Sequence, residues 1–105
     1  MRALLGSLTI AALLALAAPK AGDAEKGKAV YERRCAACHP AASAEKKLGP
    51  GLKGLFKKRR MQNGQKPTGE NVRARIEKGG GGMPAYKEML AESEKAELLA
   101  YLKTL

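Results

Sequence analysis

Three observations in the sequence predict a small all-α domain of three to four short helices. Apolar residues recur three and four positions apart in three segments, which is the spacing of one helix face. Alternating runs between hairpin turns are missing, so strands are not expected. The chain has 105 residues with only three Tyr, one Phe and no Trp, which predicts one domain with a weak core.

The N-terminus has the pattern of a secretory signal peptide, which we expect to be cleaved. Residues 3–18 carry no charge, follow the basic Arg2, and contain the small-residue sequence Ala-Leu-Ala at 15–17. We assign residues 1–17 to this peptide and expect the mature protein in the periplasm. The apolar stretch is shorter than the roughly 20 residues of a membrane-spanning helix, although an uncleaved anchor is the alternative.

The first predicted helix covers residues 24–34. Asp23 precedes it with a side chain suited to capping, and Gly27 and Tyr31 lie one turn apart on the same face. Pro40 prevents the helix from continuing past His39.

Two further helices are predicted in the second half of the chain. One begins at Thr68 or Gly69 and runs through Lys78, and the other follows a Ser93 cap and ends near Lys103. The last helix has an apolar stripe formed by Leu98, Tyr101, Leu102 and Leu105. Glycine and proline predict a turn at 48–52, a surface loop at 61–68 and an irregular segment at 79–84.

The strongest motif is Cys35-Ala36-Ala37-Cys38-His39, whose C-x-x-C-H spacing is typical of c-type haem attachment. The two thiols can bind the two vinyl groups of one porphyrin, and the adjacent imidazole can bind the iron. His39 is the only histidine in the chain. We therefore predict that Cys35 and Cys38 bind one haem c covalently and that His39 is an iron ligand.

Three other uses of these cysteines fit the sequence less well. A redox dithiol needs no adjacent histidine and normally follows a strand in a βαβ unit, which is not predicted here. A structural zinc site needs four ligands, and a second Cys/His pair is missing. A disulfide would close a very short loop and add little stability, so it would leave the weak core without support.

Iron bound by one imidazole needs a sixth ligand or has an open position. A thioether is a soft ligand that raises the reduction potential. Apart from the N-terminal one, the methionines are Met61, Met83 and Met89. Met83 is the predicted ligand because it lies between four glycines and a proline, where the backbone can approach a porphyrin. Met61 and Met89 are interpreted as surface or packing residues.

With these motifs the sequence resembles the class I monohaem cytochromes c, particularly the short bacterial ones. The resemblance covers residues 22–105, which we take as the domain. It rests on Gly27 and Tyr31 before the C-x-x-C-H motif, Leu48-Gly49-Pro50-x-Leu52, Met83-Pro84-x-Tyr86, and the terminal Leu98-Leu99-Ala100-Tyr101-Leu102.

The resemblance implies a fold in which the first and last helices cross at the haem edge. It implies that Gly27 is small so that Leu98 and Tyr101 can approach it. It also implies that the Pro50 carbonyl accepts a hydrogen bond from His39 Nδ1, a contact that orients the imidazole.

The function that this resemblance implies is one-electron transfer, and no enzymatic activity is expected. With both axial positions filled by the protein, the iron has no site for a substrate. A ligand-binding or peroxidase-like haem protein with a labile sixth ligand is the alternative, favoured by the glycine run. A basic adaptor without haem, which binds anionic surfaces, is a third possibility.

The charge balance predicts an acidic partner. The chain has 20 Lys+Arg against 10 Asp+Glu and a net charge of +10, and loss of Arg2 with the signal peptide would leave +9. Basic residues concentrate at Lys53, Lys57, Lys58, Arg59 and Arg60. They form either a solvated face or a docking surface for an acidic redox protein. An exported protein is not expected to meet nucleic acid, membrane contact is expected only through membrane-bound partners, and a monomer is expected.

Overall fold

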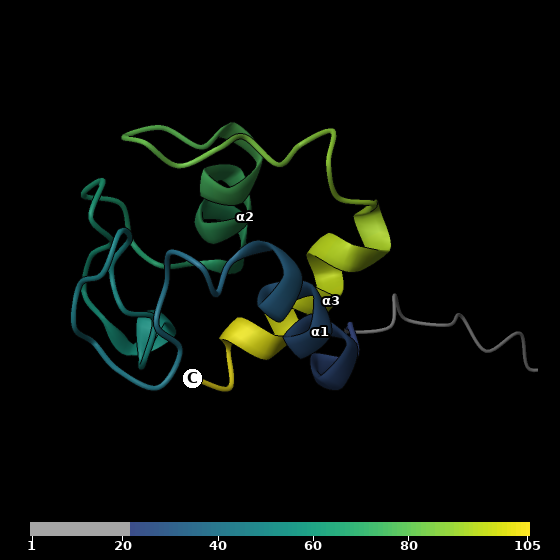
Figure 1. The fold of residues 1–105 in the computed structure, drawn as a ribbon. Coiled ribbons are helices and arrows are strands. Elements are labelled where there is room, and N and C mark those ends of the chain that lie inside the picture. The colour runs from purple at the N-terminus through teal and green to yellow at the C-terminus, as the bar shows by residue number, and fades with distance from the viewer. Residues whose placement is uncertain (1–21) are drawn as a thin grey trace, which may run out of the picture.

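A computed structural model describes residues 22–105 and contains three α-helices and one short 3₁₀ helix in this range (Figure 1). The elements are α1 (Ala24–Arg34), η1 (Leu55–Lys57), α2 (Gly69–Lys78) and α3 (Glu92–Leu102). Within 22–105 the only β-type pairing is one isolated bridge, so the predicted all-α fold of three to four helices is confirmed. The predicted signal peptide, residues 1–17, lies outside the described residues.

The first two α-helices begin where the sequence predicts. Asp23 Oδ1 accepts a hydrogen bond from the Glu25 amide at 2.9 Å and caps α1. Thr68 Oγ1 accepts from the Asn71 amide at 3.1 Å and caps α2. Each side chain satisfies a donor that the helix start leaves free.

The predicted cap of the last helix is wrong. Ser93 lies inside the first turn of α3, and Ala91 is the N-cap residue. The Glu94 carboxylate reaches back and accepts from the Ala91 amide at 3.0 Å, so an acidic side chain three positions into the helix performs the capping. No residue with a capping side chain is needed at the N-cap itself.

The helices α1 and α3 cross in close contact (Figure 1). A side chain at Gly27 would collide with the Glu97 carbonyl group and with Tyr101 Cβ. The close approach implied for Tyr101 is therefore present, and the nearest backbone contact is made by Glu97. Tyr31 and Tyr101 extend the contact, with ring centroids 5.3 Å apart.

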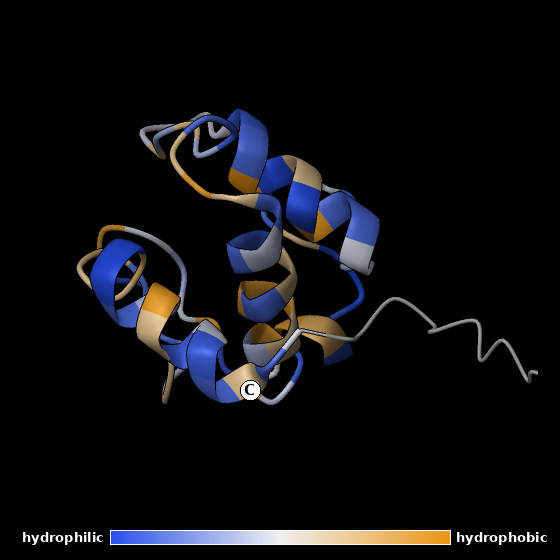
Figure 2. Ribbon diagram, turned by 90° about the vertical axis from the view of Figure 1, so that its right-hand side faces the viewer, coloured by the Kyte–Doolittle hydropathy of each residue, from blue (hydrophilic) through white to orange (hydrophobic). Residues whose placement is uncertain are grey.

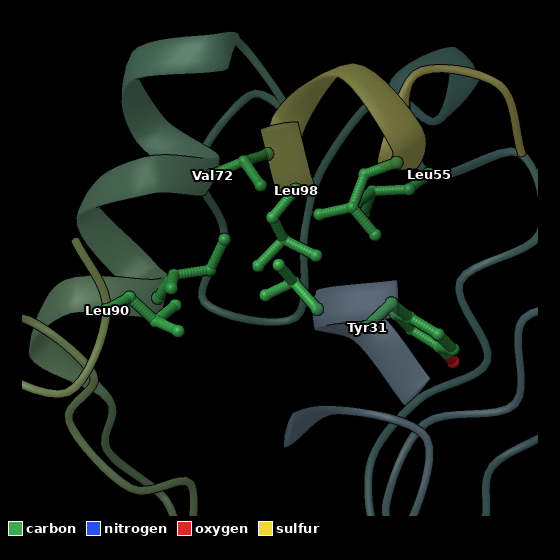
Figure 3. Packing of buried hydrophobic residues seen from close by; sticks show 8 residues of the cluster. Tyr31, Leu55, Val72, Leu90 and Leu98 are labelled. Carbon is green, nitrogen blue, oxygen red and sulfur yellow. The ribbon is translucent and has the colours of Figure 1, made fainter. Parts of the chain in front are cut away.

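The core lies where the three α-helices meet. Leu98 is fully buried and lies between Val72 of α2 on one side and Tyr31 and Leu55 on the other (Figure 3). The buried hydrophobic residues are Val30, Tyr31, Leu55, Val72, Ile76, Leu90, Leu98 and Leu102. Figure 2 shows hydrophobic positions interleaved with hydrophilic ones along the helices, as expected when each helix buries one stripe.

No helix within residues 22–105 has the length and apolar character needed to cross a bilayer. The predicted surface loop at 61–68 is exposed except at Met61, which is half-buried, and Pro67, which is buried. The short helix η1 was not predicted, because three residues are too few to show a helical period.

Candidate functional site

The C-x-x-C-H motif forms a hydrogen-bonded turn directly after α1. Cys35 is the C-cap of α1, and the Tyr31 carbonyl accepts from the amides of Cys35 and Ala36 at 2.8 and 2.9 Å. The Cys35 carbonyl in turn accepts from the amides of Cys38 and His39 at 3.1 and 3.0 Å. Both thiols and the imidazole are thereby carried on one continuous turn.

His39 is held by three contacts, two on its ring and one on its backbone. Its Nδ1–H donates to the Pro50 carbonyl oxygen, with the two atoms 2.8 Å apart, which is the contact that the family resemblance implies. The Tyr31 hydroxyl donates to the His39 carbonyl oxygen. Gly49 lies against the ring so closely that a side chain there would collide with three of its atoms.

Two backbone hydrogen bonds hold the motif against the turn at 48–52. The Gly49 amide donates to the Cys38 carbonyl at 2.7 Å, and the Leu52 amide donates to the Pro40 carbonyl at 2.8 Å. The turn predicted at 48–52 therefore packs along the residues that follow the second cysteine. This explains why glycine and proline occur there: Gly49 leaves room for the imidazole, and Pro50 presents an acceptor to it.

Met83 lies on a loop that begins and ends on the last turn of α2. The carbonyl of Arg75 accepts from the Gly79 amide at 2.8 Å, and the carbonyl of Ile76 accepts from the Tyr86 amide at 2.9 Å. Gly80 and Met83 form a pair of backbone hydrogen bonds of 2.9 and 3.1 Å. The glycine run, expected to be irregular, is therefore a defined turn.

A single cavity of about 600 Å³ brings the predicted site residues together. Cys35, Cys38, His39 and Met83 all line it. Its volume lies within the range of sites for small molecules and cofactors. The apolar part of the wall is formed by Pro50, Leu52, Leu55, Val72, Ile76, Leu98 and Leu102. These residues come from 50–55, α2 and α3, and five of them, Leu55, Val72, Ile76, Leu98 and Leu102, also belong to the core, so the cavity is continuous with the core.

The other two methionines, interpreted as surface or packing residues, lie in different surroundings. Met61 is half-buried, packs against the core and lines the same cavity as Met83, so it is a packing residue. Met89 is 47% exposed and is not among the lining residues. The cavity thus contains two thioethers and one imidazole.

The cysteines have the character of attachment residues rather than of a redox dithiol. Both are half-buried and unbridged. Burial, with a smaller contribution from Cys38, raises the pKa of Cys35 to about 11. A redox C-x-x-C motif depends on a lowered thiol pKa and an accessible thiolate, which this environment disfavours.

The lining residues fit a haem. Because the Pro50 carbonyl can only accept, Nδ1 of His39 carries the proton, and Nε2 keeps the lone pair that binds a metal. Two thiols at C-x-x-C spacing, one oriented imidazole and soft thioethers line a space whose wall is mostly apolar. This donor set matches covalently attached iron porphyrin with nitrogen and sulfur axial ligands.

Comparison with known proteins agrees with this chemistry. The family model described as Cytochrome C oxidase, cbb3-type, subunit III, matches residues 22–102. The chain belongs to the cytochrome c family. Covalently attached haem c is the cofactor of this family, so the alternative of a basic adaptor without haem is wrong.

Two of the cytochromes c that this one resembles are similar to it over most of its length. A cytochrome c6 of Leptolyngbya boryana is 34% identical over 80 residues, which cover 76% of this chain and 89% of the relative. A cytochrome c-553-like protein of Synechocystis sp. is 32% identical over 91 residues, which cover 80% of this chain and 70% of the relative.

A shorter and more identical match occurs with a eukaryotic protein. Cytochrome c 2.1 of Caenorhabditis elegans is 54% identical over 36 residues, which cover 34% of this chain and 32% of that protein. The chain thus spans about a third of the length of this relative.

A basic hollow lies next to the cavity of this cytochrome. Five exposed cations surround it: Lys57, Lys58, Arg59, Arg60 and Lys66. We call this set the basic cluster. Four of its members were predicted from the sequence, Lys66 was not, and Lys53 is not part of it. Lys58 and Arg60 also line the cavity, so the cluster adjoins the cavity mouth.

Proposed function

We propose that this cytochrome is an exported one-electron carrier with one haem, bound by Cys35 and Cys38 and ligated by His39 and Met83. The observation that carries the proposal is that one apolar cavity is lined by both thiols, the oriented imidazole and a thioether. The haem, when bound, supplies an iron that takes up and releases a single electron.

Each protein group has a separate task at this site. Cys35 and Cys38 would bind the porphyrin through thioethers from the turn after α1. The Pro50 carbonyl, by accepting from Nδ1, makes Nε2 of His39 the more basic ligand and fixes the ring plane. The Met83 thioether, a soft ligand, favours the reduced metal and raises the reduction potential.

Electron transfer is favoured over ligand binding or peroxidase-like chemistry. A labile sixth ligand was predicted only from the flexibility expected of the glycine run. The paired hydrogen bonds between Gly80 and Met83 support a defined Met83 loop instead. If His39 and Met83 both bound the iron, they would leave no position for a substrate or peroxide.

The basic cluster supports docking of an acidic redox protein. Opposite charges raise the rate of encounter and select the docking face. Because Lys58 and Arg60 line both the hollow and the cavity, a partner drawn to the cluster would be placed at the cavity mouth, where the path for electron transfer is short. We propose that no nucleic acid is bound and that the protein acts as a monomer.

The location of the protein follows from its first residues. We propose that residues 1–17 are a cleaved signal peptide and that residues 22–105 are the cytochrome domain in the periplasm. Membrane contact would then occur only through membrane-bound partners. Mass spectrometry of the protein purified from the periplasmic fraction of its native cells should give the mature N-terminus and the mass added by one haem.

Covalent attachment can be tested by extraction. Haem-loaded protein is denatured in acid and organic solvent, and the haem should stay with the polypeptide. In a Cys35→Ala/Cys38→Ala variant loaded with the same haem, the haem should be extracted. Release of haem from the unaltered protein would contradict the proposal.

A further inference from the structure

The Met83 loop is fastened at both of its ends to the C-terminal turn of α2. The carbonyls of Arg75, Ile76 and Glu77 accept from the amides of residues 79, 86 and 87, at 2.8, 2.9 and 3.2 Å. These are carbonyls that a helix end leaves without partners. The position of Met83 is therefore set by the end of one helix.

Between these ends the chain reverses through four successive glycines. Gly79, Gly80, Gly81 and Gly82 all have positive φ, from 62° to 115°, a region that only glycine enters without strain. A run with four such residues has little intrinsic stiffness, because glycine loses more conformational entropy on folding than other residues. The turn needs support from outside its own backbone.

The side chain of Arg75 provides this support. Its guanidinium donates to the carbonyls of Gly79 at 3.3 Å and of Gly80 at 3.1 Å. It also lies 3.3 Å from the place where a side chain of Gly80 would begin, and 3.5 Å from that of Gly81. Arg75 is half-buried and lines the same cavity as Met83. One planar group thus contacts three of the four glycines of the turn, Gly79, Gly80 and Gly81.

The neighbouring arginine of α2 has a different role. Arg73 donates to Glu77 at 2.8 Å and also pairs with Glu92. Its guanidinium therefore forms ion pairs within α2 and between α2 and α3. The two arginines carry the same charge on one helix, and only Arg75 contacts the glycine turn.

We propose that Arg75 is a positioning residue that holds the Met83 thioether in place as the sixth ligand. This inference rests on the proposed role of Met83. A bidentate guanidinium that bridges two carbonyls limits the motion of the turn. Without it, Met83 would leave the iron more often, and an external ligand would compete more successfully.

The test is the affinity of the ferric haem-loaded protein for imidazole, followed by its absorption spectrum. Imidazole must displace the sixth ligand, so its affinity reports how firmly that ligand is held. Arg75→Ala should bind imidazole about tenfold more tightly, which corresponds to about 1.4 kcal/mol. Arg75→Lys keeps the charge but cannot bridge two carbonyls, and should give an intermediate affinity. Arg73→Ala is the matched control and should bind imidazole like the unaltered protein.

A double variant separates positioning of Met83 from a general effect on the cavity. In a Met83→Ala background, Arg75→Ala should not change imidazole affinity further, because the group that Arg75 positions is gone. An equal increase in both backgrounds, or an unchanged affinity in Arg75→Ala alone, would overturn the role of Arg75. If Met83→Ala by itself does not tighten imidazole binding, the proposed ligand fails, and the inference fails with it.

Discussion

The two regions that supply the proposed axial ligands are held in different ways. In the first, residues 35–52, contacts reach the ligand side chain itself: Pro50 accepts from His39 Nδ1 and Gly49 packs on the ring. In the second, residues 69–87, the contacts fix the backbone of the Met83 loop and come from α2. We call these the His39 region and the Met83 region.

This difference indicates which of the two regions tolerates substitution. The imidazole is oriented by direct contacts, so any shift of its neighbours moves the ligand. The thioether is reached through a long, flexible side chain on a glycine turn, so small backbone shifts can be absorbed. We therefore expect substitutions in the His39 region to be damaging and comparable substitutions in the Met83 region to be mild.

The largest expected effect is a contrast between two glycine substitutions. Gly49→Ala would place a methyl group against the His39 ring, with an expected loss of about 3 kcal/mol and of more than about 10 °C in Tm. Gly82→Ala adds a methyl group in open space, and its positive φ of 92° is the only obstacle, with an expected loss of about 1 kcal/mol. Thermal unfolding of the two haem-loaded variants measures the contrast, and equal losses would contradict it.

A second prediction concerns the basic cluster, which belongs to neither ligand region. Replacing Lys57, Lys58, Arg59 and Arg60 by Gln should slow electron transfer to an acidic partner by about tenfold at low salt. It should also flatten the fall of the rate with ionic strength, where the screening length is about 8 Å at physiological salt. Stopped-flow kinetics measures both.

The matched control removes the same charge elsewhere. The four exposed residues Lys26, Lys28, Lys78 and Lys87 are replaced by Gln in one variant, which should keep most of the rate and its salt dependence. If both variants respond alike, net charge rather than a docking surface sets the rate, and the cluster is a solvated face.

The smallest expected effect concerns the acid stability of the helix that supports the Met83 loop. Arg73 lowers the pKa of both Glu77 and Glu92, with Lys95 contributing; Lys95 Nζ lies 3.5 Å from Glu77 and 3.1 Å from Glu92. Folded carboxylates with a lowered pKa stabilise the protein above the usual glutamate pKa of about 4.3, and this contribution is lost as the pH falls below it.

Glu77→Gln should therefore lower Tm by a few degrees at pH 7 and make Tm less dependent on pH below about 4.5. The exposed Glu88 provides the control: Glu88→Gln should retain the acid dependence of the unaltered protein. Thermal unfolding from pH 7 to pH 3 measures both. If Tm of Glu77→Gln falls with pH as steeply as Tm of the unaltered protein, these ion pairs do not stabilise α2.

The sequence allowed much of this to be predicted because the relevant signals are local. Asp23 and Thr68 identify helix starts because each side chain lies next to the helix that it caps. Cys35, Cys38 and His39 indicate haem attachment because all three lie within five consecutive residues. The start of α3 was mispredicted because Glu94, three positions into the helix, caps it instead of Ser93.

What the sequence did not reveal depends on contacts between distant segments. Gly49 contacts His39 only because the turn at 48–52 packs along the motif, and Arg75 contacts the glycine run only because that run folds back on α2. The cationic neighbours of Met61 left open whether it is a surface or a packing residue, and only the folded chain shows that it lines the cavity. A single sequence holds no signal for such contacts.

The identity of the sixth ligand is the central claim, and carbon monoxide binding tests it most directly because the cavity contains two thioethers. The haem-loaded Met83→Ala and Met61→Ala variants are reduced and exposed to carbon monoxide, and absorption spectra are recorded. Met83→Ala should retain its haem and bind carbon monoxide readily, while Met61→Ala should keep the spectrum of the unaltered protein. If Met61→Ala binds carbon monoxide and Met83→Ala does not, or if neither variant binds it, the assignment of Met83 as the sixth ligand is contradicted.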